Sequence, residues 1–162
     1  MAGTWTALLS TWANKAISIA RMNAYFSLTG NMQYLYERVP TLTDIPYSAG
    51  NFTSDTGSWT VQEADQTAFC YILNGVQCTL MFSLNTTSIS GTPERLYIKM
   101  PVTASHQVVT TFRLLDTGTE RLGVCYTEAD SDVLNLFSPS GTFATSTNAT
   151  VVQGEIVFPL SE

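Results

Sequence analysis

Hydrophobic residues near the start of the chain recur at helical spacing. Between Ser18 and Val39 they follow one another at steps of three or four, which places them in one stripe along a helix. Ser18 can cap the start of this helix, and Pro40 ends it because the residue before a proline is disfavoured in the helical region. The pattern predicts one α-helix over 18–39. Its stripe consists of Ile19, Met22, Tyr25, Leu28, Met32, Leu35 and Val39.

Two kinds of partner can cover this stripe. The helix has fewer than three complete heptads, so we do not expect it to be stable alone. It packs either on its own domain or on the same helix of other subunits, and the sequence leaves both open with a preference for the oligomer.

The spacing of hydrophobic residues changes from helical to alternating after 41–57, a stretch without a sustained period. Short alternating runs then follow to the end of the chain, and Asn74-Gly75 between two of them predicts a type I′ hairpin turn. Strands are predicted at 58–63, 67–73, 76–84, 95–100, 107–115, 121–127, 133–137 and 151–158, with a weaker one at 142–145.

These elements predict a mainly β protein. Strands at hairpin spacing without a second helix indicate an antiparallel β-sandwich of jelly-roll kind, with a closed barrel as the alternative. We expect three segments: a loop and helix for attachment or oligomerisation at 1–40, a linker at 41–57, and a β-sandwich head at 58–162.

The charge balance excludes some classes of partner. The net charge is −6, which argues against a surface that neutralises phosphates, so we expect no nucleic acid partner. Charged residues are 12% of the chain, about half the usual share, and 24 threonines and 15 serines take their place, a composition that suits strands. Neither a signal peptide nor a membrane-length apolar run is present, so we expect synthesis in a cytosol and no membrane insertion.

No pattern of residues nominates a catalytic or metal site. His106 is the single histidine, and no nucleophile or acid stands at a fixed spacing from it. Glu128, Asp130 and Asp132 alternate as carboxylates of a calcium loop can, but the remaining ligands are missing, which favours an acidic turn. We therefore expect no catalytic residue, no cofactor, no metal and no enzymatic activity.

Three cysteines are too few and too scattered for a disulfide framework or a zinc site. Cys70, Cys78 and Cys125 form no C-x-x-C pair, and free buried thiols are expected. Cys70 and Cys78 lie in adjacent strand-like runs, so a disulfide across that hairpin is the alternative.

Four aromatic residues are candidates for binding a sugar. Trp59, Tyr126, Phe137 and Phe143 lie in or beside strands and loops. A flat aromatic ring stacks on a sugar face, but the same surface fills a core, and the sequence alone does not separate the two roles.

Several stretches resemble tailed-bacteriophage virion structural proteins of tail-fibre-like or head-fibre-like kind. Two of them are similar to the segment in which a tryptophan-containing loop precedes a helix, and three resemble the β-sandwich head that follows. The stretches are Trp12–Asn23, Gly30–Tyr36, Thr86–Pro93, Leu96–Ala104 and Gly154–Leu160. The chain departs from the usual pattern at Asn14-Lys15, where such proteins have Gly-Asp or Gly-Glu, and it is short for a tail fibre.

The resemblance implies a structural virion component, usually a homotrimer, whose helix contacts other virion proteins and whose head faces outward. A surface appendage that contributes to host attachment, with a host cell-surface glycan as one partner, is the leading hypothesis. A capsid decoration or head-fibre protein and a carbohydrate-binding module are the alternatives. The resemblance carries over no catalytic residue.

Overall fold

The computed structural model describes residues 40–161, which belong to one β-rich unit. The predicted helix at 18–39, with its apolar stripe, lies outside the described residues. In chain order the elements are β1 (Leu42–Asp44), η1 (Ala49–Asn51), β2 (Phe52–Ser54), β3 (Ser58–Thr60), η2 (Glu63–Asp65), β4 (Gln66–Asn74), β5 (Gln77–Ser90), β6 (Arg95–Ala104), β7 (Val109–Asp116), β8 (Thr119–Thr127), β9 (Ser131–Phe137) and β10 (Ser146–Pro159).

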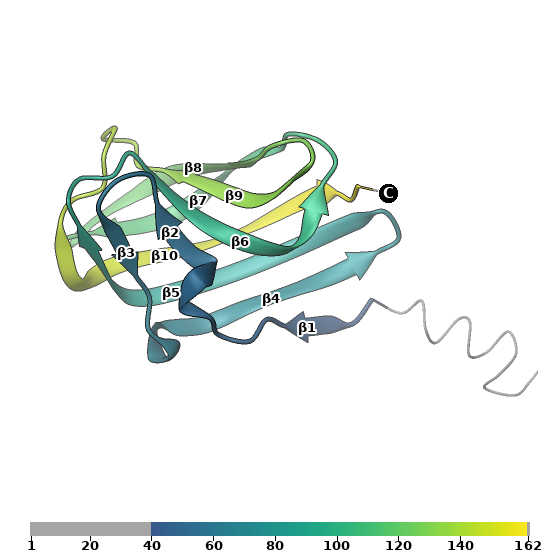
Figure 1. Cartoon of the computed structure of the whole chain (residues 1–162), viewed down its shortest axis with the longest axis horizontal. Helices are drawn as coiled ribbons and strands as arrows, with labels where there is room; N and C mark the ends of the chain where they lie inside the picture. Colours follow the sequence, from purple (N-terminus) through teal and green to yellow (C-terminus); the bar gives the residue numbers. More distant parts are fainter. Residues whose placement is uncertain (1–39, 162) are drawn as a thin grey trace, which may run out of the picture. The chain divides into compact units, whose positions relative to one another are not determined.

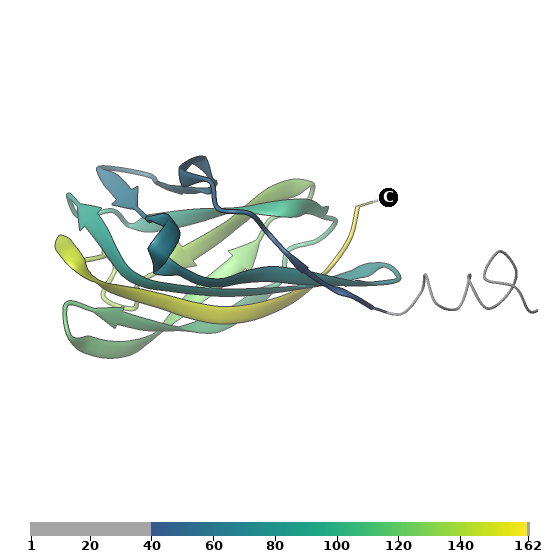
Figure 2. The same ribbon diagram turned by 90° about the horizontal axis from the view of Figure 1, so that it is seen from below.

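The ten strands of the described residues belong to one hydrogen-bonded sheet in which the neighbours are antiparallel. Their order is β1-β4-β5-β10-β7-β8-β9-β6-β2, and β3 lies beside β5 (Figure 1). Figure 2, at right angles to the first view, shows the sheet folded over itself in two layers. The prediction of a mainly β, antiparallel protein is confirmed, although one curled sheet stands where two separate sheets were expected.

Irregular positions in the two longest strands accompany this curl. Thr86 in β5 and Asn148 in β10 have positive φ values of 52° and 51°, and the β5–β10 register shifts near both. Such bulges bend a strand and increase its twist. As a result β5 pairs with β4 through its first part and with β3 through Ser88–Ser90.

The predicted hairpin is present, but its turn lies one residue later. Asn74 pairs with Gln77, so Gly75 and Val76 form the loop. Gly75 has a φ of +61°, whereas Val76 is not in the positive region. Positive φ at the first central residue alone is the pattern of a type II′ turn, in place of the type I′ turn that Asn-Gly predicted.

Residues 41–57, where a linker was predicted, contain β1, η1 and β2. Phe52 in β2 is only 3% exposed and belongs to the core. Each of these strands is three residues long, which is too short to show an alternating pattern. The sequence pattern therefore did not predict that this segment contributes strands to the sheet.

Two predicted strands differ from the observed ones. The weak strand at 142–145 is a loop, and β10 begins at Ser146. The strand predicted at 58–63 ends at Thr60, because the chain turns into the 3-10 helix η2. At its start the backbone N–H of Gln62 donates to Oδ2 of Asp65 at 2.8 Å, and the N–H of Asp65 donates to the carbonyl of Gln62 at 3.0 Å.

The core lies between the two layers and is built around large aromatic side chains. The rings of Phe82 and Phe112 are 6.5 Å apart, and each pairs across strands with a glycine, Gly154 and Gly123 respectively. A Cβ atom on Gly123 would lie 2.3 Å from Cζ of Phe112. These glycines provide the space that the rings occupy.

Candidate functional site

Polar and aromatic side chains gather on the outer face of β6, β9 and β8. In the register of these strands Asn135 lies between Tyr97 on one side and Tyr126 on the other, and Arg95 lies opposite Phe137 in the adjacent row. The residues that alternate with them, such as Leu96, Ile98, Leu134, Leu136 and Cys125, are fully buried, so these five side chains point away from the core. We call Arg95, Tyr97, Tyr126, Asn135 and Phe137 the aromatic patch.

Ring contacts hold the patch in a defined arrangement. Tyr126 and Phe137 stack with ring centroids 5.4 Å apart and an angle of 18° between the rings. The guanidinium carbon of Arg95 lies 5.1 Å from the centroid of Phe137. A cation over an exposed ring contributes about 0.5–1 kcal/mol, enough to bias the arginine toward one position.

Asn135 is the most unusual member of the patch. It is only 6% exposed, yet no group in residues 40–161 forms a hydrogen bond with its amide. Neither amide atom is fully enclosed. Buried polar side chains normally have a partner. The amide therefore offers two N–H donors and one acceptor at the surface between the two tyrosines.

The charges around Tyr126 oppose one another. Burial is the main factor that raises the pKa of Tyr126; Arg95 lowers this pKa, and Glu128 raises it through its charge and through a hydrogen bond. The phenol donates that bond to Oε1 of Glu128 at 3.4 Å. Tyr126 therefore remains protonated at neutral pH, between a cation and an anion.

The four aromatic residues that the sequence nominated lie in two different environments. Tyr126 and Phe137 lie together in the patch, half-buried. Trp59 and Phe143 are in the core, 5% and 0% exposed, and the indole N–H of Trp59 donates to Oγ1 of Thr87 at 3.0 Å. Trp59 and Phe143 therefore pack in the core and are not members of the aromatic patch.

Sequence reasoning missed Arg95, Tyr97 and Asn135. Tyr97 and Asn135 each stand between buried aliphatic residues in predicted strands, so the alternation placed them on the outer face. The pairing of β6 with β9 and of β9 with β8, which brings the residues together, was not available from the sequence.

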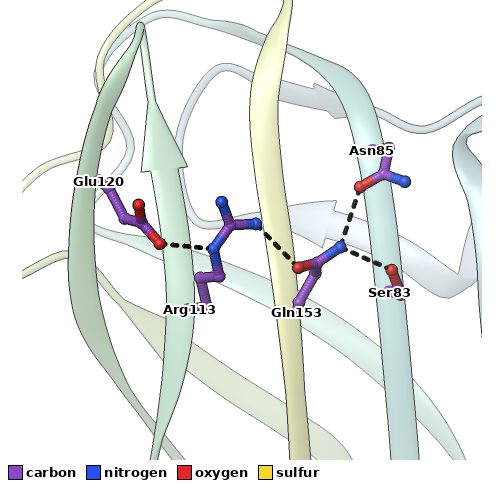
Figure 3. Close-up of polar contacts among 5 residues, drawn as sticks. All are labelled: Ser83, Asn85, Arg113, Glu120 and Gln153. Atoms are coloured by element: carbon purple, nitrogen blue, oxygen red, sulfur yellow. Dashed lines mark hydrogen bonds and ion pairs between the residues drawn. The ribbon is translucent and has the colours of Figure 1, made fainter.

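A second polar cluster on the outer face differs from the patch because its members satisfy one another (Figure 3). Arg113 donates from Nε to Glu120 Oε1 at 2.6 Å and from Nη1 to Gln153 Oε1 at 2.9 Å. Gln153 in turn donates to Ser83 Oγ at 3.0 Å and Asn85 Oδ1 at 3.2 Å. This network ties β8, β7, β10 and β5 together across the sheet.

Other candidate chemistry from the sequence is dispersed. The carboxylates of Glu128, Asp130 and Asp132 contact different partners, namely Tyr126, Ser161 and Lys99. Within residues 40–161 no three potential metal-ligating side chains cluster, and no helix there has the length and apolarity needed to cross a membrane.

His106 and the cysteines show no sign of reactive chemistry. The histidine ring lies in an exposed loop, with Nδ1 2.8 Å from Oγ of Ser105. The three thiols are free and buried. Cys70 pairs with Met81 and Cys78 with Leu73, an odd offset that places the two cysteines on opposite faces of the sheet and excludes the disulfide between them.

No family model and no curated protein matches the chain. Among solved structures it is similar to a reovirus attachment protein, sigma1, in complex with alpha-2,3-sialyllactose, with 12% sequence identity and a TM-score of 0.36. The alignment covers 67% of this chain and 61% of the sigma1 chain.

Proposed function

We propose that residues 40–161 form the binding head of a non-enzymatic virion surface protein, and that the aromatic patch binds a glycan of the host cell surface. The observation that carries this proposal is the buried Asn135 amide without a partner among the described residues, flanked by two tyrosines. Sugars present an apolar C–H face that packs on aromatic rings and hydroxyls that bond to an amide.

The virion context of the proposal comes from the sequence resemblance to tailed-phage structural proteins. On this proposal the chain is a tail-fibre-like appendage, made in the bacterial cytoplasm and assembled on the particle as a homotrimer. The helix predicted at 18–39 anchors it to other virion proteins. A head-fibre or capsid decoration protein is the alternative, and gold labelling of particles at the tail tip or over the capsid separates the two.

A glycan array probed with the full chain tests the binding function. We expect binding by the wild type, and a loss of about tenfold or more for Asn135→Leu and Tyr126→Ala, because each removes contacts worth about 1.4 kcal/mol or more. Ser83→Ala is the matched control, since it lies on the same outer face within the Arg113 network. Thermal unfolding of each variant verifies that it is folded.

Two results would overturn the proposal. One is a wild-type protein that binds no glycan at high protein concentration. The other is binding that both folded patch variants retain, which would place the contact surface elsewhere.

A further inference from the structure

Arg95 and Arg113, both on the outer face, differ in whether their charge has a partner. Arg113 forms an ion pair with Glu120 at 2.6 Å. Arg95 lies over the Phe137 ring, and no carboxylate in residues 40–161 forms an ion pair or side-chain hydrogen bond with its guanidinium. Among the described residues, the aromatic patch thus contains a cation whose N–H donors are free.

We infer that the glycan bound by the aromatic patch carries an anionic group, a carboxylate or a phosphate ester, and that Arg95 binds this group. The inference rests on the proposed function. The guanidinium is a planar fork of donors that matches both oxyanions in a bidentate manner. The Phe137 ring holds Arg95 in place, so less side-chain freedom is lost when a ligand binds.

The surrounding charges indicate where the anion lies. The protein carries a net charge of −6, so an anionic ligand needs a local cation to approach. Arg95 is in the row on one side of Tyr97, Asn135 and Tyr126 and has no carboxylate partner among the described residues. On the other side Glu128 follows Tyr126, and the cation of that row, Lys99, forms an ion pair with Asp132 at 3.9 Å. The anion belongs on the Arg95 side, and neutral hydroxyls belong near Glu128.

Matched pairs of oligosaccharides test the inference. The full chain is titrated with uronic-acid oligosaccharides and their carboxyl-reduced forms, and with phosphorylated oligosaccharides and their dephosphorylated forms. We expect one anionic set to bind about tenfold or more tightly than its neutral counterpart. That set identifies the anion. Its binding should weaken when salt is raised from about 0.05 M to about 0.5 M.

Two arginine positions complete the test. Arg95→Gln should abolish the preference for the anionic form, and Arg113→Gln should retain it because Arg113 is already paired (Figure 3). Arg95→Lys, which keeps the charge but not the fork, should fall between the wild type and Arg95→Gln.

The outcomes separate this inference from the proposed function. Equal binding of anionic and neutral forms, or an unchanged preference in folded Arg95→Gln, overturns the role of Arg95 and leaves glycan binding standing. Binding to none of the four sets, together with a blank array, overturns both.

Discussion

The amide of Asn135 has no partner within residues 40–161, and the residue is only 6% exposed. A polar group without a partner costs up to about 1–3 kcal/mol when it is fully buried, and less where its atoms keep some exposure, as here. Asn135 lies between Leu134 and Leu136, which are fully buried, and its own side chain faces two tyrosines. Binding sites commonly sacrifice stability in this way. The proposed role in glycan binding would account for an asparagine at this position.

Replacement of Asn135 by leucine should therefore not destabilise the protein. We expect Asn135→Leu to have an unfolding free energy that is unchanged or higher by up to about 1 kcal/mol, since no hydrogen bond within residues 40–161 is lost. Urea denaturation measures this free energy, provided that the dependence on urea concentration is the same for the variant and the wild type. A loss of more than about 1 kcal/mol would show that the amide stabilises the fold instead.

The buried thiols make stability depend on alkaline pH. Burial raises the pKa of Cys125 to about 12 and that of Cys78 to about 11, above the ordinary value of about 8.5. The unfolded chain therefore loses these protons first. Their contribution to stability is complete below about pH 8.5 and declines as the pH rises toward 12.

Urea midpoints measured between about pH 8 and pH 11 test this dependence. Other groups titrate in the same range, so the comparison is with Cys125→Ala, whose midpoint should fall less steeply. If the urea midpoints of the two proteins fell equally steeply with pH, Cys125 would ionise as readily in the folded protein as in the unfolded chain.

At the scale of elements, the glycines opposite phenylalanines fix how closely β7 and β8 pack. A Cβ at position 123 would lie 2.3 Å from Phe112 Cζ, whereas Gly50 has nothing nearer than Ser48 Oγ at 3.8 Å and no positive φ. We expect Gly123→Ala to lower the unfolding free energy by about 1–3 kcal/mol. Gly50→Ala should stay within about 0.5 kcal/mol. Similar midpoints for both variants in urea would contradict this packing.

Alternation along the strands made most of the sheet predictable from the sequence. In β5, Cys78, Leu80, Phe82 and Leu84 alternate with polar or half-buried neighbours, and each of the four is buried. The three-residue strands were missed because they span less than two periods. The curl was missed because the bulge at Thr86 depends on pairing with a distant strand.

The candidate site was predictable only in part. The sequence did not separate outward-facing rings from core rings: Tyr126 lies on the outer face, whereas Phe143 lies in a loop, where no period indicates which way a ring points. Trp59 was ambiguous because β3 is three residues long. The neighbours of Asn135 come from strands paired over long sequence distances, which a single sequence does not reveal.

At the scale of the whole molecule, we propose that the appendage assembles as a homotrimer. We expect light scattering of the full chain to give a mass near three times 17.7 kDa that persists on dilution. In that case the apolar stripe predicted at 19–39 forms the contact between subunits. A stable monomer across the dilution series would contradict the trimer and leave a decoration subunit that assembles only on its particle.

The central claim is that the aromatic patch binds a glycan through Asn135. Its most direct test is a titration of the best array glycan into full-length wild type, Asn135→Leu and Ser83→Ala, at equal folded concentration. We expect Ser83→Ala to bind like the wild type and Asn135→Leu to be weaker by about tenfold or more. Equal affinity for all three folded proteins would contradict it.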